Sequence, residues 1–226
     1  MPIHRGDDIE FFPEEHIYKV SGKTKTSITK LIQEVGLSPK FGAWARPAAE
    51  KGISIHSACD AYDTGKDIPI EGDKYLLNWI KFKKEHGAKW QEVEQKYSRG
   101  QVAGRVDRIG IVDDTRYVID IKTGKRKADN PVPDYMKAQL GGYVWMLGPN
   151  VQPEHVKVGI VWLAEDGYWF DEVDTGDCLA WWNKCLEMWA NGEVFENRSA
   201  LLPEVPGSLV QIYLDALKEL EKAHER

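Results

Sequence analysis

The sequence predicts an α/β protein in which helices flank a mixed central sheet. Three strand-like segments follow one another at residues 90–97, 102–112 and 117–121, and the short turns between them predict an antiparallel meander. A helical segment then separates this meander from a strongly apolar strand at residues 155–163. Because a helix between two strands allows a crossover connection, we expect parallel as well as antiparallel strand pairs.

The N-terminal part of the chain predicts a hairpin followed by helices. Residues 9–20 have the pattern of two short strands joined by a turn. Ser27 is a suitable N-cap for a short helix that Gly36 ends. Longer helical patterns follow at residues 44–62 and 75–86, each with apolar side chains on one face.

The C-terminal part predicts two more helices and a strand pair. Residues 168–173 should pair with the apolar strand that precedes them, and residues 176–191 form a tryptophan-rich helix. A last amphipathic helix is expected at residues 208–221. Cys178 and Cys185 share one face of the tryptophan-rich helix, which predicts that they pack in the core.

Length and composition suit one domain. The chain has 226 residues, of which 42% are hydrophobic, enough for one sizeable core. The net charge of -6 argues against a protein that coats duplex DNA, although a local basic strip could still bind nucleic acid. No apolar run approaches the ~18 residues of a membrane span. The N-terminus also lacks an apolar signal core, so we expect a cytoplasmic protein that does not associate with membranes.

Charged residues interrupt two of the predicted strands. Side chains alternate along a strand, so Asp120 and Lys122 should point the same way, while Ile121 points into the core and its carbonyl can face the same pocket. Asp107, on the neighbouring strand, comes within reach if the two strands pair in register. An ordinary ion pair between Lys122 and a strand acid is the simpler alternative, because D-x-K is a common tripeptide.

Two carboxylates and a carbonyl are hard oxygen ligands, which suit Mg²⁺ or Mn²⁺ better than Zn²⁺. Without a cation, two buried carboxylates would repel each other, and one would tend to take up a proton. A divalent ion supplies the Lewis acid that phosphodiester hydrolysis needs, and an adjacent ammonium stabilises the charge that develops. The residues Thr123, Lys125 and Arg126 follow directly and are candidates for phosphate contacts.

Four short motifs, in this order, resemble those of the PD-(D/E)xK nuclease superfamily in its RecB-type branch. They are G-I-S-I-H at Gly52–His56, G-R-V-D at Gly104–Asp107, V-I-D-I-K-T-G at Val118–Gly124 and Q-L-G-G-Y at Gln139–Tyr143. The segment S-I-T-K-L at Ser27–Leu31 is further similar to phage exonucleases and to the mitochondrial genome-maintenance exonuclease. The resemblance implies a restriction-endonuclease-like core and one nuclease domain over residues 1–226. We divide it into a hairpin and helix (1–40), a catalytic core (41–175) and C-terminal helices (176–226).

The resemblance also implies roles for individual residues. The metal ligands would be His56, Asp107, Asp120 and the carbonyl of Ile121, and Lys122 would be the catalytic lysine. Taken alone, a histidine beside an apolar helix face is more simply a core or rim residue, so the ligand role of His56 rests on the resemblance.

Further residues are expected near this site. The resemblance places Gln139 among the residues of the catalytic site, together with Tyr143, which lies one helical turn later on the same face and would contact DNA or support Gln139. Either Glu92 or Glu94 could add an acid, although both also fit solvent-facing strand positions. Trp44 is the best candidate for stacking on a base, and Arg46 beside it is a further candidate for contacting nucleic acid.

The expected activity is that of a Mg²⁺- or Mn²⁺-dependent DNA exonuclease. Its substrate would be DNA that is single-stranded or has free ends, in phage or prophage recombination or DNA maintenance, inside a bacterial or phage-infected host cell. A recombination or single-strand-binding protein is a candidate partner. Two alternatives remain: a structure-specific or restriction-like endonuclease, and a non-catalytic DNA-binding module of the same fold. Cys59, Cys178 and Cys185 stand at the wrong places for an iron–sulfur cluster, so none is expected.

Overall fold

A computed structural model of the chain describes residues 3–12, 17–39, 46–68, 72–126, 129–148 and 155–195. Contacts divide the chain into two compact units, Met1–Val194 and Phe195–Arg226. The fold described below is that of the first unit. The helix predicted at residues 208–221 lies outside the described residues, as does Trp44.

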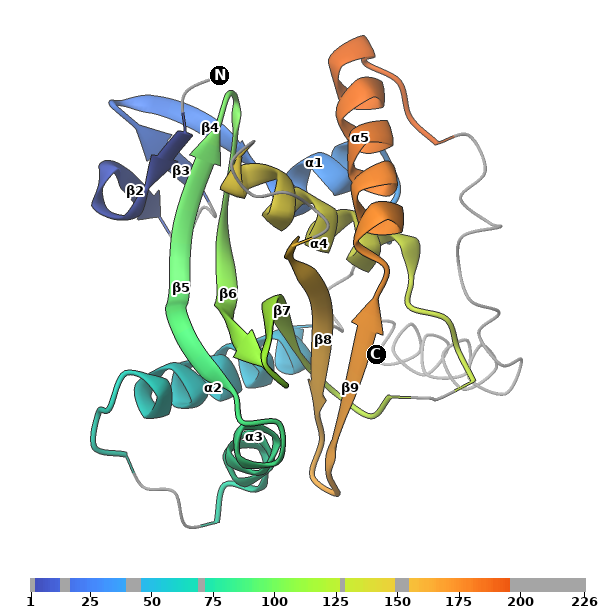
Figure 1. Cartoon of the computed structure of the whole chain (residues 1–226). Helices are drawn as coiled ribbons and strands as arrows, with labels where there is room; N and C mark the ends of the chain where they lie inside the picture. Colours follow the sequence, from blue (N-terminus) through green and yellow to red (C-terminus); the bar gives the residue numbers. More distant parts are fainter. Residues whose placement is uncertain are drawn as a thin grey trace, which may run out of the picture. The chain divides into compact units, whose positions relative to one another are not determined.

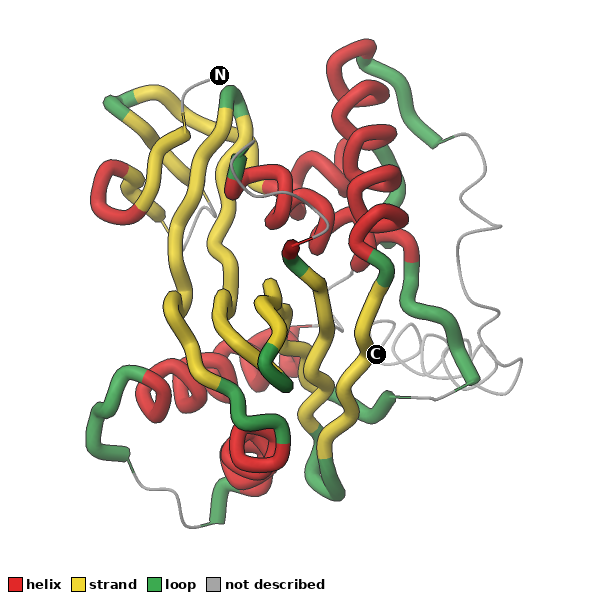
Figure 2. The backbone as a smooth tube through the Cα atoms, viewed as in Figure 1, coloured by secondary structure: helices red, strands yellow, loops and turns green. Residues whose placement is uncertain are grey.

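The described part of the chain contains one mixed sheet (Figures 1 and 2). Its main path runs in the order β2-β3-β4-β6-β7-β8-β9, and β5 pairs with both β1 and β6. The pairs β4–β6 and β7–β8 are parallel and the others antiparallel, which confirms the predicted mixed sheet. The strands are β1 (Ile3–Arg5), β2 (Ile9–Phe12), β3 (Ile17–Val20), β4 (Lys23–Ser27), β5 (Lys89–Arg99), β6 (Val102–Val112), β7 (Thr115–Thr123), β8 (Lys157–Leu163) and β9 (Tyr168–Val173).

Helices form two groups on the sheet. Figure 1 shows α1 (Ile28–Glu34), α4 (Asp134–Leu147) and α5 (Thr175–Asn191) gathered in the upper part of the view, and α2 (Arg46–Asp63) and α3 (Lys74–Glu85) in the lower part. A single turn of 3-10 helix, η1 (Gly6–Asp8), links β1 to β2. No helix among the described residues is long and apolar enough to cross a membrane.

The alternation of β7 directs its side chains to both groups. Ile119 and Ile121 are fully buried in a core that includes Cys59 of α2 and Trp79 of α3. Asp120 and Lys122 face the opposite way and contact α4 through Gln139. One strand therefore joins the larger hydrophobic core to the polar site.

Helix α4 packs closely on α5 because it carries glycine at the contact. A Cβ atom on Gly141 would lie 2.0 Å from the carbonyl oxygen of Cys178. Cys178 and Cys185 are fully buried, as the helical spacing predicted, and so is Trp182. The glycine pair of the Q-L-G-G-Y motif thus allows the helix that carries Gln139 to sit close to its neighbour.

The predicted N-cap is confirmed, since Ser27 Oγ accepts a hydrogen bond from the Lys30 amide at 3.1 Å. The prediction for the preceding residues was incomplete. The polar segment Lys23–Ser27 is a strand, β4, and the short β1 was not expected at all. Neither segment has an apolar alternation, and both are extended because neighbouring strands supply their hydrogen bonds.

Candidate active site

Asp107 and Asp120 lie where strands β6 and β7 separate. The ladder between them runs from Val112–Thr115 to Arg108–Ile119 and ends one pair short of the two aspartates. Beyond that point the Ile121 amide donates a hydrogen bond to Asp107 Oδ2 at 2.8 Å. A backbone donor is thus satisfied by a side chain, which fixes the Asp107 carboxylate next to β7. Asp107 is only 7% exposed and Asp120 only 2%.

Lys122 is held between Asp120 and helix α4. Its Nζ lies 2.7 Å from Asp120 Oδ2 and donates to Gln139 Oε1 at 3.2 Å. Gln139 Nε2 in turn donates to Asp120 Oδ1 at 3.3 Å and to the Tyr143 hydroxyl at 2.7 Å. The structure therefore brings Gln139 and Tyr143 to the aspartate and lysine of β7.

His56 reaches the same place from α2. Its Nε2 lies 2.9 Å from the carbonyl oxygen of Ile121, and its Nδ1 lies 3.7 Å from Asp107 Oδ2. Gly52, one turn earlier, allows the helix to approach the end of β7, because a Cβ there would stand 3.4 Å from Thr123 Oγ1. The close approach of helix and strand explains how a residue 65 positions upstream meets Ile121.

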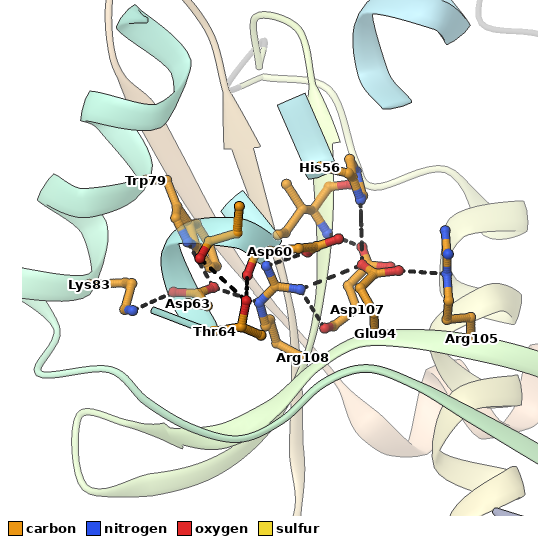
Figure 3. Close-up of polar contacts among 12 residues, drawn as sticks. His56, Asp60, Asp63, Thr64, Trp79, Lys83, Glu94, Arg105, Asp107 and Arg108 are labelled. Atoms are coloured by element: carbon orange, nitrogen blue, oxygen red, sulfur yellow. Dashed lines mark hydrogen bonds and ion pairs between the residues drawn. The ribbon is translucent and has the colours of Figure 1, made fainter. Parts of the chain in front are cut away.

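Glu94 is the acid on β5 that joins the site (Figure 3). It stands opposite Asp107, between the strand pairs Val93–Arg108 and Gln95–Val106. Donor atoms of His56, Glu94 and Asp107 all lie within 4.8 Å of one another. Glu94 has a φ of 50°, a left-handed conformation that is costly for a residue other than glycine and is found most often at functional sites.

Glu92, the other glutamate that the sequence left open, is turned to different partners. Its carboxylate lies 2.9 Å from Arg5 Nη2 and accepts a hydrogen bond from the Tyr97 hydroxyl. Sequence alone could not separate the two, because residues two apart on a strand share a face.

Charges in this group shift one another's pKa values. Burial, reinforced by Asp120 and Glu94 and partly offset by His56 and Lys122, raises the pKa of Asp107 to about 6. Burial by itself would lower the pKa of His56, but Asp107, Glu94 and Asp120 outweigh it and raise that pKa to about 9. Burial also opposes a charge on Lys122, yet Asp120 and Asp107 raise its pKa. The acids thus favour added positive charge, either as a proton on His56 or as a metal ion.

The donor set fits a divalent cation. The imidazole of His56 and the carboxylates of Glu94 and Asp107 are close enough to hold one ion, and Asp120, outside that group, adds a carboxylate to the wall of the same cavity. We call Glu94, Asp107 and Asp120 the carboxylate cluster. Carboxylate oxygens with one imidazole suit Mg²⁺ or Mn²⁺, and two of these carboxylates are nearly inaccessible to water. Burial is the main cause of the raised pKa of Asp107, and a cation bound among them would offset the repulsion from Asp120 and Glu94 that adds to it.

The site opens into one cavity of about 460 Å³. This volume lies within the roughly 300–1,000 Å³ typical of small-molecule pockets. Strands, the hairpin and three helices all contribute to its wall, which consists of Phe11, Tyr18, Ser27, Ile28, Thr29, Ala49, Gly52, Ile53, His56, Ser57, Asp60, Gly104, Arg105, Asp107, Asp120, Lys122, Gln139 and Tyr143.

A second group of buried charges adjoins the first (Figure 3). Arg108 is fully buried and donates to Asp63 Oδ2 at 2.8 Å and to Asp60 Oδ1 at 2.7 Å. We call these three residues the arginine cluster. The guanidinium also donates to the Asp107 carbonyl at 2.7 Å and lies 5.4 Å from the Trp79 ring centroid. Sequence reasoning missed this cluster, although a cation inside an apolar strand signals that acids must lie nearby.

Those of the residues predicted to contact nucleic acid that the structure describes lie outside the wall of the cavity. Lys125 and Arg126 each pair with an aspartate of the β8–β9 hairpin. Arg46 pairs with a glutamate one turn later on α2, at 3.0 Å. Thr123 ends β7 beside the second turn of that helix. Trp44 lies outside the described residues, so its stacking role stays a prediction.

Comparison with known protein families identifies the chain. The family model described as the PD-(D/E)XK nuclease superfamily matches residues 42–223. The chain therefore belongs to the PD-(D/E)XK nuclease superfamily, whose members are metal-dependent nucleases. The family predicted from the four motifs is confirmed, and so is the mixed-sheet fold; the RecB-type branch stays a prediction.

Two solved structures are similar to the chain at low identity. SSO0001 is 18% identical with a TM-score of 0.38, and the match covers 75% of this chain and 78% of that one. A phage related exonuclease from Haemophilus somnus 129PT is 10% identical with a TM-score of 0.35, and the match covers 74% of this chain and 92% of that one. No curated protein matches the sequence.

Proposed function

We propose that the chain is a divalent-metal-dependent DNA exonuclease that acts on ends or on single strands, in phage or prophage recombination or in DNA maintenance. One observation carries the proposal. His56, Asp107, Asp120 and Lys122 come from a helix and two strands, and they line a single cavity. A module that only bound DNA would gain nothing from burying several acids at its contact surface, because they repel the phosphate backbone.

In this proposal Mg²⁺ or Mn²⁺ is held by His56, Asp107, Asp120 and the Ile121 carbonyl, and Glu94 is a further ligand. Bound there, the cation supplies Lewis-acid polarisation of the scissile phosphate. The protein contributes a fixed set of donors. Asp107 is held by the Ile121 amide, and Asp120 by Lys122 and Gln139, so the carboxylates need little rearrangement on binding.

Lys122 is the proposed catalytic lysine. Its neighbours Asp120 and Asp107 keep its pKa above the ordinary value, so it stays a cation at neutral pH. A fixed ammonium in a buried site stabilises negative charge that develops on the phosphate or on the attacking oxygen. Gln139 accepts from Lys122 and donates to Asp120, and the Tyr143 hydroxyl accepts from Gln139. We therefore assign Gln139 and Tyr143 to positioning the lysine rather than to chemistry.

Cleavage of several DNA forms tests the proposal. Wild-type protein with Mn²⁺ or Mg²⁺ should shorten end-labelled linear DNA, single-stranded or duplex, and should leave closed circular DNA intact. Either a chelator or Asp120→Ala should lower the rate by about a thousandfold, because a Lewis acid is worth several kcal/mol and each 1.36 kcal/mol is tenfold. Asp166→Ala, an aspartate in the β8–β9 turn, is the matched control and should cut normally.

Two results would change the conclusion. If no cleavage depends on both the metal and Asp120, the chain is not a nuclease of this mechanism. Nicking of closed circles by wild-type protein but not by Asp120→Ala would keep the mechanism and replace the exonuclease by an endonuclease.

A further inference from the structure

The β2–β3 hairpin contributes two aromatic residues to the cavity. Phe11 and Tyr18 are direct partners in its antiparallel register, and their ring centroids lie 4.6 Å apart with planes inclined by 31°. Opposite residues of such a pair project from the same face of a hairpin. Both rings belong to the cavity wall that also contains Asp107 and Asp120.

The hairpin is fixed in place by its own small core. Ile9, Tyr18 and Val20 pack with Ala103 of β6, and all four are at least 96% buried. Tyr18 is therefore an anchored part of the wall, while Phe11 packs against this core and stays half-buried. The match to the superfamily model starts at residue 42, so this wall belongs to a segment that precedes the matched region.

Arg105 connects the aromatic wall to the carboxylate cluster. Its guanidinium carbon lies 5.5 Å from the centroid of the Phe11 ring, and its Nε lies 2.5 Å from Glu94 Oε2. Its side chain is 45% exposed. The wall of this cavity of about 460 Å³ thus carries two aromatic rings and a cation as well as Asp107, Asp120 and Lys122.

We propose that this end of the cavity is a binding subsite for the base of an unpaired nucleotide, the one that flanks the scissile phosphate. The proposal deepens the nuclease function above and rests on it. Stacking on Phe11 would use the π-face that every base has, so the subsite would tolerate any base. A base still paired in a duplex would bring its complementary strand with it, and a cavity of this size has room for one nucleotide. The subsite would therefore select frayed ends and single strands.

Substitution of Phe11 provides the first test. Base–aromatic stacking is worth about 1–3 kcal/mol, so Phe11→Ala should lower kcat/KM on single-stranded DNA about 5–150-fold, mainly through KM. Phe11→Trp should keep most of the activity. The matched control is Phe12→Ala, since Phe12 is the next residue of the same strand, outside the cavity wall, with its ring 4.7 Å from the Lys19 ammonium. Equal losses for Phe11→Ala and Phe12→Ala would overturn the subsite.

A change in the substrate tests the same contact on unaltered protein. An oligonucleotide that is abasic at the nucleotide flanking the cut should lose as much kcat/KM with the wild type as Phe11→Ala loses with normal DNA. The abasic strand should lower the kcat/KM of Phe11→Ala little further, because both changes remove the same contact. Independent, additive losses, or no loss on the abasic strand, would contradict the proposal.

A binding measurement without cleavage tests the base-binding subsite separately from the nuclease function. Single-stranded trinucleotides with 2-aminopurine at each position in turn, bound in the presence of Ca²⁺, should show stacking-dependent quenching at one position. Phe11→Ala should abolish the quenching and Phe12→Ala should not. Quenching in a protein that cleaves no DNA would leave the subsite standing and remove the nuclease function. Normal cleavage with no Phe11-dependent quenching would leave the nuclease function standing and rule out the subsite.

Discussion

Asp107 and Arg108 are neighbours on β6, yet they belong to groups of buried charge that are neutralised in different ways. In the arginine cluster, Asp60 and Asp63 are paired with a guanidinium, and the ammonium of Lys83 adds a second cation on Asp63. In the carboxylate cluster, Arg105 pairs with Glu94 and Arg108 Nη1 lies 3.5 Å from the same carboxylate, but part of the neutralising charge is a proton on His56, whose pKa is raised to about 9. A proton can be exchanged for a metal ion, whereas a guanidinium cannot.

The difference shows how one strand can carry both a stabilising ion-pair cluster and the proposed metal site. The arginine cluster ties α2 to β6 and holds the helix that carries His56 in place. In the carboxylate cluster, burial and the neighbouring acids Asp120 and Glu94 disfavour the charge on Asp107 and raise its pKa, so an added cation would be favourable there. Sites that bind ions commonly carry such unfavourable energy, and the surrounding fold compensates for it.

The largest effect is expected from breaking the arginine cluster. Arg108→Met removes the guanidinium from Asp60 and from the fully buried side chain of Asp63, which keeps the Lys83 ammonium as its remaining cation. Removing one partner of a buried ion pair typically costs about 3–5 kcal/mol, so the free energy of unfolding should fall by that amount in urea titrations. Arg105→Met is the control: its ion pair with Glu94 is partly exposed, and its loss should cost no more than about 1 kcal/mol.

Neutralising the aspartates distinguishes the loss of a buried cation from a simple packing defect. If the uncompensated acids are responsible, Asp60→Asn and Asp63→Asn introduced into the Arg108→Met protein should recover much of the lost stability. A loss below about 1 kcal/mol for Arg108→Met, measured in chelator, would show that the two clusters do not differ as described.

The next effect concerns the proton on His56. Because its folded pKa, about 9, lies above the ordinary histidine value of 6.5, the proton stabilises the folded state fully below pH 6.5, and this contribution is lost as pH rises through 9. At 1.36 kcal/mol per pKa unit, the free energy of unfolding in chelator should fall by about 3 kcal/mol across that window. His56→Gln should remove most of the fall. Saturating Mn²⁺ should also suppress it, because a ligating imidazole is neutral. An unchanged pH slope in His56→Gln would refute the assignment.

Parts of this comparison could be predicted from sequence, and parts could not. The shared face of Asp120 and Lys122 could be predicted, because the alternation of side chains along one strand is a local property. The family motifs brought in His56 and Gln139, which no local rule connects to β7. Glu94 could not be chosen over Glu92, because the choice depends on the register of β5 against β6 and on one left-handed residue. Both are set by tertiary contacts.

The arginine cluster was open to prediction but was missed. Asp60 and Asp63 stand three residues apart, so they share one face of α2, and Arg108 interrupts an otherwise apolar strand. A buried cation requires partners, and these two acids on a predicted helix were available. The β4 strand offered no such signal. Its sequence is polar, and only its neighbours β3 and β6 make it extended.

The smallest expected effect is an increase in the free energy of unfolding, opposite in sign to the loss expected for Arg108→Met. Asp107→Asn removes the charge that burial disfavours, while the amide oxygen can still accept from Ile121. The folded pKa of Asp107, about 6, exceeds the ordinary 3.8, so protonation stabilises the fold below pH 3.8 and this gain is lost as pH rises through 6. At pH 8 in chelator, the variant should therefore be more stable than the wild type by about 1–2 kcal/mol. This is less than the full pKa shift would give, because a buried amide also loses hydration.

With Mn²⁺ the order of stability should reverse, because only the wild type keeps the full set of proposed ligands. Urea titrations with and without the metal measure this difference in the free energy of unfolding under both conditions. A variant that is destabilised in chelator would mean that the carboxylate cluster is as fully compensated as the arginine cluster.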